Sequence, residues 1–407
     1  MSAPAPRRFR SWRHILDKLK AASKVATAAA IDAAVLLLVP RARGTVREAL
    51  VIRLDAIGDF VLASDGLATL CHHYSRNGLR TTLVANRAWS DLARELDIAD
   101  VVLPVNRRAL VRNPAYRFAF MARLRRRGAA VAVSPVMSRE FLHADSIVRL
   151  SGAGERIGSA GDLANCRAWQ KRLSDRWYTR LLPANPAVTH EIDRSREFLA
   201  GLGLDPPIQG TEWSRLALQS PLPEPRPSTY YVLALGAGLA GKTWPVDRFA
   251  EVARRIHAAT GWTAMLVGAP HEEHLARAFV ERVNFPVEDR VGHSSVRELV
   301  SLIATAKFVV GNDSGPIHIA AHCGVASAAV LGGGHFSRFL PYPNDLPASL
   351  RAPLVAFQAM PCYGCIWRCI YDVPAALPRP CIEAVTAEAL WAVVRNELAL
   401  THPNMAR

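Results

Sequence analysis

The feature that most constrains this chain is an alternation of short apolar runs with longer mixed segments, which occurs twice along the sequence. Residues 46–220 contain the runs ALVIRL, TTLVAN and AAVAVSPV, and residues 230–334 contain YYVLALG, WTAMLVGAP, FVVGND and ASAAVLGGG. Short strands that alternate with helices are typical of parallel sheets with crossover helices. The sequence therefore predicts two α/β domains of the Rossmann type.

A proline-rich stretch separates the two halves. SPLPEPRPST, residues 220–229, contains four prolines, and proline suits neither a helix interior nor a central strand. We therefore expect five parts: a basic segment over 1–45, an N-terminal domain over 46–220, a linker over 221–229, a C-terminal domain over 230–360, and a cysteine-rich loop with a last helix over 361–407. Ligands of such folds bind at the carboxyl ends of the strands, and two domains add a cleft between them.

The basic charge is concentrated at the N-terminus. The 407-residue chain has a formal net charge of +15, and its first 43 residues hold nine Lys or Arg against two Asp. Clustered basic residues would suit nucleic acid, but here they flank an apolar run, residues 25–39, that is too short to cross a bilayer. We expect either an amphipathic helix on an anionic membrane surface or a helix packed on the first domain.

Four of the seven cysteines are clustered in the C-terminal part. Cys362, Cys365, Cys369 and Cys381 have a spacing compatible with a tetrahedral site for zinc or iron. Such a site would be structural, because four thiolates leave no open coordination position. The alternative is reduced thiols or redox pairs. An odd cysteine count without a secretory signal favours a reducing cytosol.

GAGLAGKT, residues 236–243, matches both G-x-G-x-x-G and the P-loop pattern. A P-loop needs its helix to run on through Gly-Lys-Thr so that backbone amides point at the phosphates. Here Pro245 follows Trp244, lacks an amide hydrogen and disfavours a helix before it. We therefore expect the helix to begin at Pro245 and Lys242 to bind phosphate from a loop of a different shape.

VVGNDSGPIHIAAHCG, residues 309–324, predicts a strand followed by a helix with an anion-binding start. Asp313 or Ser314 can cap the helix, Gly315 permits close backbone approach and Pro316 suits the first helical position. An ordinary capped helix is the alternative, and it leaves His318 unexplained.

LVIRLDAIGDFVLASDGLATL, residues 50–70, predicts a buried strand over 50–54 and a helix from Phe60. Gly58 and Asp59 then fall at the turn between them. The Asp59 carboxylate is either a helix cap or a reagent. His190 with Glu191 and Asp193 could form a metal or acid–base cluster, but we expect these residues to start a surface helix.

Four motifs in order resemble glycosyltransferase family 9, the ADP-heptose:lipopolysaccharide heptosyltransferases. NDSGPIHIAAHCGVASAAVLGG is similar to the family's nucleotide-sugar signature, and VIRLDAIGDFVLASDGLATL to its N-terminal strand, Gly-Asp turn and helix. LGAGLAGKTWPVDRFAEVA resembles its Lys-x-Trp-Pro element, and VGAPHEEHLA its next strand and acidic turn. Together these motifs span residues 50–331.

The resemblance implies an α/β GT-B fold, in which two Rossmann-like domains with parallel sheets face an interdomain cleft, and inverting transfer without a catalytic metal. By position it makes Asp59 the catalytic base, Lys242 the donor-phosphate ligand and Glu272 a nucleoside contact. The full set of substrate-binding residues it implies is Gly58, Lys242, Thr243, Glu272, Asp313, Ser314, Gly315, Pro316 and His318. Many members carry a Ser-Ser pair where this chain has Asp55 and Ala56, so the acceptor is not assigned.

A related branch, the autotransporter heptosyltransferases, is similar in carrying a cysteine iron finger. By this resemblance the four clustered cysteines are the candidate ligands of a structural zinc or iron ion.

We therefore expect a glycosyltransferase that passes a heptose or related sugar from a nucleotide-sugar donor, ADP-heptose above others, to a lipopolysaccharide-core or other saccharide or glycolipid acceptor. It would use no catalytic cofactor, bind no nucleic acid, and be cytoplasmic with peripheral contact to the anionic inner membrane. The alternatives are a nucleotide-sugar 2-epimerase of similar fold and a P-loop NTPase using residues 236–243.

Overall fold

The structure, a computed structural model, describes residues 12–42, 46–205, 213, 215–217 and 226–401. These residues form two compact units. The first unit contains the chain up to Leu54, Tyr74–Arg87 and Val101–Pro183, and the second contains Asp55–His73, Ala88–Asp100 and the chain from Ala184 onward. Residues 221–225 of the expected linker lie outside the described part.

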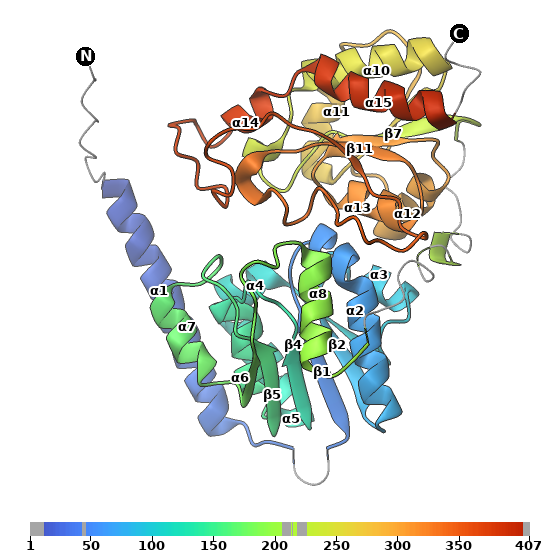
Figure 1. The fold of residues 1–407 in the computed structure, drawn as a ribbon. Coiled ribbons are helices and arrows are strands. Elements are labelled where there is room, and N and C mark those ends of the chain that lie inside the picture. The colour runs from blue at the N-terminus through green and yellow to red at the C-terminus, as the bar shows by residue number, and fades with distance from the viewer. Residues whose placement is uncertain (1–11, 43–45, 206–212, 214, 218–225, 402–407) are drawn as a thin grey trace. The chain divides into compact units, whose positions relative to one another are not determined.

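The first unit is built on a parallel sheet of six strands in the order β3-β2-β1-β4-β5-β6 (Figure 1). This order reverses between β1 and β4, as in doubly wound dinucleotide-binding folds. All six residues of β1 are buried, because helices cover both faces of such a sheet. The strands are β1 Glu48–Arg53, β2 Arg80–Asn86, β3 Val101–Val105, β4 Val131–Ser134, β5 Glu155–Ser159 and β6 Arg180–Leu182.

The helices of the N-terminal half connect these strands. They are α1 Trp12–Leu38, α2 Ile57–Arg76, α3 Ser90–Glu95, α4 Arg107–Arg112, α5 Pro114–Arg127, a π-helical turn Phe141–Asp145 that continues into α6 Ser146–Leu150, α7 Ala168–Asp175 and α8 Glu191–Gly201. By the division into compact units, α3, α8 and most of α2 belong to the second unit.

Helix α1 packs on the first unit, which favours the second of the two alternatives for the basic N-terminal segment. Val35 of the helix and Val39, directly after its end, are buried among the core residues of the unit. Asp32, which interrupts the apolar run, is buried and accepts hydrogen bonds from Arg117 Nε at 2.8 Å and Arg117 Nη2 at 2.6 Å. Arg125 Nε also donates to the Val39 carbonyl at the end of α1, at 2.7 Å. Part of the basic cluster over 123–127 therefore serves folding.

The second unit contains the other parallel sheet, again of six strands, in the order β12-β11-β10-β7-β8-β9 (Figure 1). The strands are β7 Tyr230–Ala234, β8 Thr263–Val267, β9 Val287–Asp289, β10 Val309–Asn312, β11 Ser327–Val330 and β12 Leu354–Ala356. Its helices are α10 Val246–Thr260, α11 Glu273–Val280, α12 Val296–Ala304, α13 Gly315–His322, α14 Pro380–Glu383 and α15 Ala387–Thr401, with the 3-10 turns η2 Ala240–Lys242, η3 Pro270–Glu272 and η4 Gly333–His335.

The predicted α/β class with two parallel sheets is confirmed, and two local predictions need correction. Helix α2 begins at Ile57 and not at Phe60, so Gly58 and Asp59 lie in its first turn. A carboxylate is favourable there because the helix dipole is positive at that end. The helix at Glu191 begins as predicted, but His190 before it is 4% exposed and does not lie on a surface.

None of the described helices is both long and apolar enough to cross a membrane.

Candidate functional site

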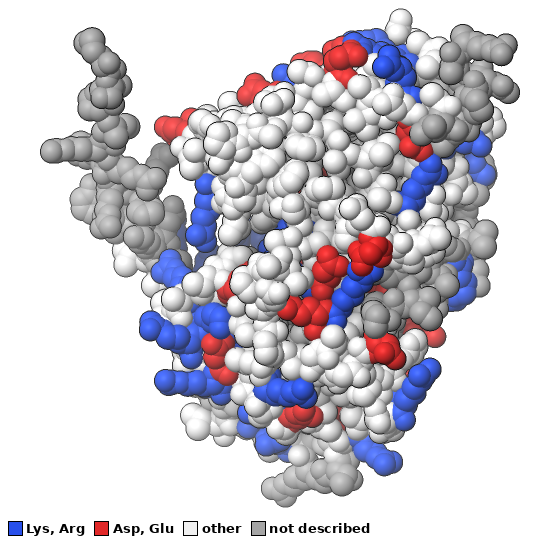
Figure 2. Space-filling model, in the orientation of Figure 1, with Lys and Arg blue, Asp and Glu red and all other residues white. Residues whose placement is uncertain are grey.

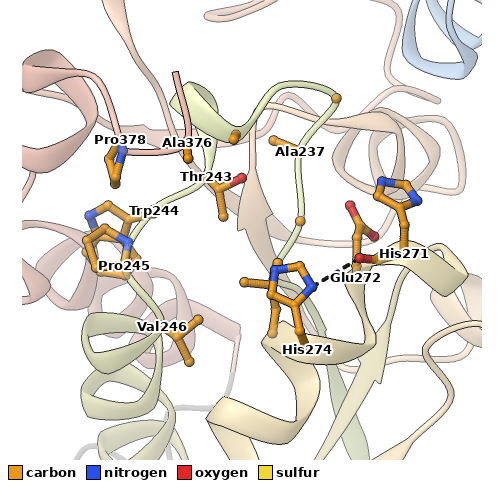
Figure 3. A pocket seen from close by; sticks show the side chains of 14 residues that line it. Ala237, Thr243, Trp244, Pro245, Val246, His271, Glu272, His274, Ala376 and Pro378 are labelled. Atoms are coloured by element: carbon orange, nitrogen blue, oxygen red, sulfur yellow. Dashed lines mark hydrogen bonds between the residues drawn. The ribbon is translucent and has the colours of Figure 1, made fainter. Parts of the chain in front are cut away.

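A pocket of about 390 Å³ lies at the carboxyl ends of β7 and β8 (Figure 3). The loop after β7, the start of α10, the η3 turn with α11, and a C-terminal segment form its walls. Its lining residues are Gly236, Ala237, Gly238, Ala240, Thr243, Trp244, Pro245, Val246, His271, Glu272, His274, Leu275, Ala376 and Pro378. The expectation that ligand-binding residues follow the strands places sites at this edge of the sheet.

Glu272 stands on the η3 wall of the pocket with one carboxylate oxygen engaged. Its Oε2 accepts a hydrogen bond from the Ala269 amide at 2.8 Å, which fixes the side chain across its own turn. A Cβ atom at Gly236 would lie 1.7 Å from Glu272 Oε1. The absence of a side chain at residue 236 is therefore what allows this carboxylate to lie against the glycine loop.

The loop over 236–243 does not have the P-loop form. After the short η2 turn, Thr243 is extended, Pro245 precedes the helix and α10 begins at Val246. This agrees with the predicted effect of Pro245. Lys242 therefore projects from a loop, and the α10 amides begin four residues after it.

Asn312, at the end of β10, joins this loop to the next one. Its Oδ1 accepts a hydrogen bond from the Trp244 amide at 2.9 Å, and its Nδ2 donates to the carbonyls of Leu235 at 2.8 Å and Gly236 at 3.2 Å. Asn312 is fully buried. The sequence motifs predicted no role for Asn312, although an amide side chain at the end of an apolar strand was the available signal.

Asp313 contacts both Lys242 and His318. Lys242 Nζ lies 3.2 Å from Asp313 Oδ2, and His318 Nε2 lies 3.6 Å from Asp313 Oδ1. Burial raises the pKa of the Asp313 carboxyl, but the charge of Lys242 and the hydrogen bond and charge of His318 outweigh this and hold the pKa far below its usual range. Asp313 is therefore ionised and does not cap α13.

Ser314 occupies the N-cap position of α13 without capping it. Its hydroxyl oxygen is buried and has no hydrogen-bond partner among the described residues. The predicted capping by Asp313 or Ser314 is thus wrong. Because a buried hydroxyl without a partner is costly, and the first amides of a helix attract anions, the start of α13 is suited to an anionic group. Gly315 and Pro316 occupy the first turn, as expected.

A second layer of aromatic groups holds His318. Tyr342 OH lies 2.9 Å from His318 Nδ1, and the two rings are nearly parallel with centroids 5.8 Å apart. His190 contacts Tyr342 edge-on and its Nε2 lies 2.9 Å from the Phe339 carbonyl. Because Tyr342 can donate to Nδ1, this arrangement favours the tautomer with the proton on Nε2, toward Asp313. Tyr342 lies outside every motif that the sequence highlighted.

The Gly58–Asp59 turn belongs to the same compact unit as α13. A Cβ atom at Gly58 would lie 3.1 Å from His318 Cδ2, and one at Gly315 would lie 2.7 Å from Ile57 Cγ2. Both glycines therefore permit close packing of the start of α2 on the start of α13. Asp59 is half-buried in the first turn of α2, one residue beyond this contact.

The four clustered cysteines lie in a segment that covers the glycines after β11. The amides of Gly364 and Ile366 donate to the carbonyls of Gly333 at 2.8 Å and Gly334 at 2.9 Å. A Cβ atom would lie 2.1 Å from the Tyr363 ring at Gly333 and 2.3 Å from the Trp367 ring at Gly334. Residues 332–334 thus form a floor without side chains, on which the two rings rest.

Two of the clustered thiols have a pKa that neighbouring thiols raise. Burial raises the pKa of Cys365 and of Cys381, and neighbouring thiols raise it further, while amide hydrogen bonds from Trp367 and Gly333 oppose the effect. In the described part of the chain, no three His, Cys, Asp or Glu side chains form a group that could hold a metal ion.

Comparison with known proteins agrees with this architecture. The family model of glycosyltransferase family 9 (heptosyltransferase) matches residues 137–359. Among solved structures, E. coli heptosyltransferase WaaC with ADP-2-deoxy-2-fluoro heptose matches at 21% identity and a TM-score of 0.61, over 86% of this chain and 99% of that one.

Two further structures show the same fold. E. coli ADP-heptose lps heptosyltransferase II matches at 16% identity and a TM-score of 0.58, over 88% of this chain and 99% of its own. A family 9 glycosyltransferase from Veillonella parvula matches at 16% identity and a TM-score of 0.60, over 87% and 97%. A search of curated protein sequences finds no significant match. Since the family model covers more than half of the chain, this protein belongs to glycosyltransferase family 9 and is a glycosyltransferase.

Proposed function

We propose that this enzyme transfers a heptose from ADP-heptose to a saccharide acceptor of the lipopolysaccharide core or a related glycolipid, with inversion at the anomeric carbon. The main support is the buried Ser314 hydroxyl at the start of α13, which has no hydrogen-bond partner among the described residues and follows Asp313, the partner of Lys242. The similar E. coli structures are named as ADP-heptose enzymes or contain an ADP-heptose analogue.

In this proposal the pocket beside Glu272 receives the nucleoside. Its volume of about 390 Å³ falls in the usual range for small-molecule sites. Glu272 Oε1 would accept a hydrogen bond from a ribose hydroxyl, because Oε2 is already engaged with Ala269. Thr243 lines the pocket between the nucleoside and Lys242.

The diphosphate and sugar would lie at Lys242 and the start of α13. The Ser314 hydroxyl and the Gly315 end of the helix would donate to phosphate oxygens, and Pro316 leaves no amide of its own to satisfy. Gly58 leaves room for His318 beside the sugar. Asp313 would hold Lys242 and His318 in place, since it contacts both.

The reaction requires one proton transfer and one bond exchange. An acceptor hydroxyl oxygen forms a bond to the anomeric carbon while the bond from that carbon to the diphosphate oxygen breaks, and a single attack from the opposite side inverts the configuration. Asp59 takes the hydroxyl proton as general base. The charge that develops on the leaving nucleoside diphosphate is stabilised by Lys242 and the α13 end.

Calorimetry with nucleotides and a sugar-transfer assay, both on purified protein, test the donor and the roles of Asp59 and Lys242. We expect ADP-heptose and ADP to bind more tightly than UDP- or GDP-sugars. Asp59→Asn should retain ADP binding and lose transfer by a factor of about 10²–10⁴, whereas Lys242→Met should weaken ADP binding itself. Transfer that survives Asp59→Asn contradicts the base assignment, and preference for another nucleotide contradicts the donor.

Incubation of the enzyme with a nucleotide sugar or with ATP tests the two alternatives, a nucleotide-sugar 2-epimerase and a P-loop NTPase. A nucleotide-sugar 2-epimerase would release an altered sugar nucleotide or its products without any acceptor, which chromatography of the products detects. A P-loop NTPase would hydrolyse ATP and lose this activity on change of Lys242, but the start of α10 at Val246 gives this alternative no structural support.

We further propose that the protein is cytoplasmic and contacts an anionic membrane surface through the first unit. Three exposed leucines lie on α1, and Trp169 and Leu173 are 44% and 40% exposed on α7 beside the exposed Arg172 and Arg176. Basic side chains gather over this part of the unit on the face shown in Figure 2. Apolar and basic groups together suit an anionic interface.

Vesicle sedimentation tests this contact. Vesicles with anionic phospholipid should retain the protein, and neutral vesicles should not. The double variant Trp169→Ser with Leu173→Ser should reduce retention severalfold. The control Leu239→Ser, at an exposed leucine of the second unit, should not. Equal retention by both vesicle types would contradict the proposal.

Finally, we propose that Cys362, Cys365, Cys369 and Cys381 hold a structural zinc or iron ion, although the described residues do not bring three such side chains together into a metal-binding group. Four thiols are the donor set these metals accept, and all four belong to the segment 362–381, part of which covers the glycines after β11. Such an ion would brace the segment and take no part in sugar transfer. Metal analysis of protein prepared without chelators should find about one ion, reduced in Cys365→Ser; a metal-free wild type contradicts it.

A further inference from the structure

The segment between Cys362 and Cys381 forms part of the wall around the proposed donor site. Ala376 and Pro378 line the pocket opposite His271 and His274 (Figure 3). The Arg379 amide donates to the Gly241 carbonyl at 2.9 Å, directly before Lys242. Lys242 Nζ lies 5.1 Å from the centroid of the Trp367 ring, within the range of a cation–π contact. The segment thus contacts both the nucleoside end and the phosphate end of the site.

The backbone that carries Trp367 is strained. Ile366 and Trp367 have φ values of +51° and +55°, in the left-handed region that is unfavourable for residues with side chains and most of all for a β-branched one. Ile366 is 43% exposed, so burial of its own side chain does not explain this conformation. Strain of this kind persists only where surrounding contacts impose it, and it concentrates at functional sites.

The surrounding contacts fix the Trp367 ring. The Ile366 amide donates to the Gly334 carbonyl, and the ring rests on the glycine floor at 332–334. His335 contacts the ring edge-on, with centroids 6.2 Å apart. The glycine backbone therefore packs against the indole, and Lys242 Nζ lies over the ring.

The indole nitrogen of Trp367 is buried without an acceptor in the described part of the chain. A buried indole usually has a partner for its N–H group, and leaving one unpaired is costly. The Ser314 hydroxyl oxygen is likewise buried without a partner in the part of the chain that the structure describes. Trp367 contacts Lys242, and Ser314 follows Asp313 in the chain, so both groups belong to residues next to the Lys242–Asp313 pair. Both can donate a hydrogen bond, which indicates a ligand with oxygen acceptors.

We propose that Trp367 is a donor-binding residue, whose indole N–H donates to an oxygen of the diphosphate group while its ring packs against Lys242. The cysteine segment would then have a specific task, namely to hold Trp367 in its strained conformation beside the phosphate loop. This inference rests on the proposed function, because it takes a nucleoside diphosphate as the ligand.

Calorimetry with ADP and adenosine tests the proposal. Trp367→Phe keeps an aromatic ring and removes the N–H, so ADP binding should weaken about ten- to hundredfold, the effect of one hydrogen bond to a charged group. Adenosine, which lacks the diphosphate, should bind wild type and variant equally. Trp391→Phe on α15, at a half-buried tryptophan that does not line the pocket, is the matched control and should change neither affinity. Thermal melts and near-ultraviolet circular dichroism verify that each variant is folded.

Two further variants separate the hydrogen bond from the scaffold. Ile366→Gly removes the unfavourable φ at that residue and should retain ADP affinity with equal or higher stability. Cys365→Ser should weaken ADP binding, and less than additively with Trp367→Phe, because both act through the same indole. Additive losses overturn the scaffold role.

The outcomes distinguish this inference from the proposed function. If wild type binds ADP and Trp367→Phe binds it equally well, the inference is wrong and the proposed function stands. If only Trp367→Ala weakens binding, the ring packs but donates nothing, which also overturns it. If no nucleoside diphosphate binds wild type, both proposals fail.

Discussion

Gly236 and Glu272 illustrate how one missing side chain shapes the site. The Glu272 carboxylate lies where a Cβ atom at residue 236 would stand, at 1.7 Å from that position. The backbone fixes the position of this Cβ atom. An alanine at 236 must therefore displace the carboxylate or the loop. The loop itself is tied to β10 through Asn312, which leaves the carboxylate as the part that moves.

We therefore predict that Gly236→Ala weakens ADP binding about five- to tenfold, by displacing Glu272 from the ribose position. In a Glu272→Ala background the same substitution should cost little more, because the clash is gone. A double-mutant cycle measured by calorimetry gives the coupling directly. Independent, additive losses would show that residue 236 acts on the nucleotide without Glu272.

A buried ion pair joins helix α1 to α5. Asp32 and Arg117 have side chains that are only 4% and 2% exposed, and the two hydrogen bonds between them join α1 to α5. A buried charge that loses its partner is far more costly than the pair itself is favourable. The attachment of α1 is therefore sensitive to either residue alone.

We predict that Asp32→Ala destabilises the first unit by about 3–5 kcal/mol and exposes α1 to limited proteolysis. The double variant Asp32→Leu with Arg117→Met removes both charges and should recover most of this loss. Urea unfolding followed by circular dichroism, with protease cleavage sites mapped by mass spectrometry, measures both effects. Equal stability of Asp32→Ala and wild type would mean that the apolar side of α1 suffices.

The elements that the sequence predicted well have strong local signals. Pro245 marked the start of α10, and the apolar runs marked β1, β7, β8 and β10. Short strands such as β9 and β12 escaped, because three residues carry too little periodicity. Tyr342 and Trp367 could not be placed near His318 and Lys242 from sequence, since long-range folding and not local pattern brings them there.

The candidate site followed the same rule. Lys242, Asp313 and His318, expected from motifs, lie together in the structure. The roles within the group were less predictable: Asp313 was expected to cap a helix and instead pairs with Lys242. A carboxylate before a helix is compatible with both tasks, and only the position of a lysine 71 residues earlier decides between them.

Four of the described histidines, two buried and two half-buried, make the whole molecule sensitive to acid. Burial lowers the pKa of His143, His190, His322 and His335 from 6.5 to about 4. Below pH 6.5 the unfolded chain binds protons that the folded chain does not, so the free energy of unfolding decreases as the pH falls. Each histidine contributes up to about 1.4 kcal/mol per pH unit between pH 6.5 and 4.

We predict that the urea midpoint is nearly constant above pH 7 and falls steeply between pH 6.5 and 4.5. His322→Asn retains a side-chain amide at the position of Nδ1, which lies 3.0 Å from the His318 carbonyl, and should reduce the pH dependence by about one proton. Circular dichroism in urea at several pH values measures this. A midpoint that does not change between pH 7 and 4.5 contradicts the prediction.

The glycine floor at 332–334 has an evolutionary consequence. Any side chain at Gly333 or Gly334 would occupy the space of the Tyr363 or Trp367 ring, so the run of three glycines is needed only while the cysteine segment lies over it. Family members that lost the segment are free to carry larger residues there. The glycine run and the cysteines should accordingly be inherited or lost together, and their joint presence would mark, in sequence alone, the lineage that shares this wall.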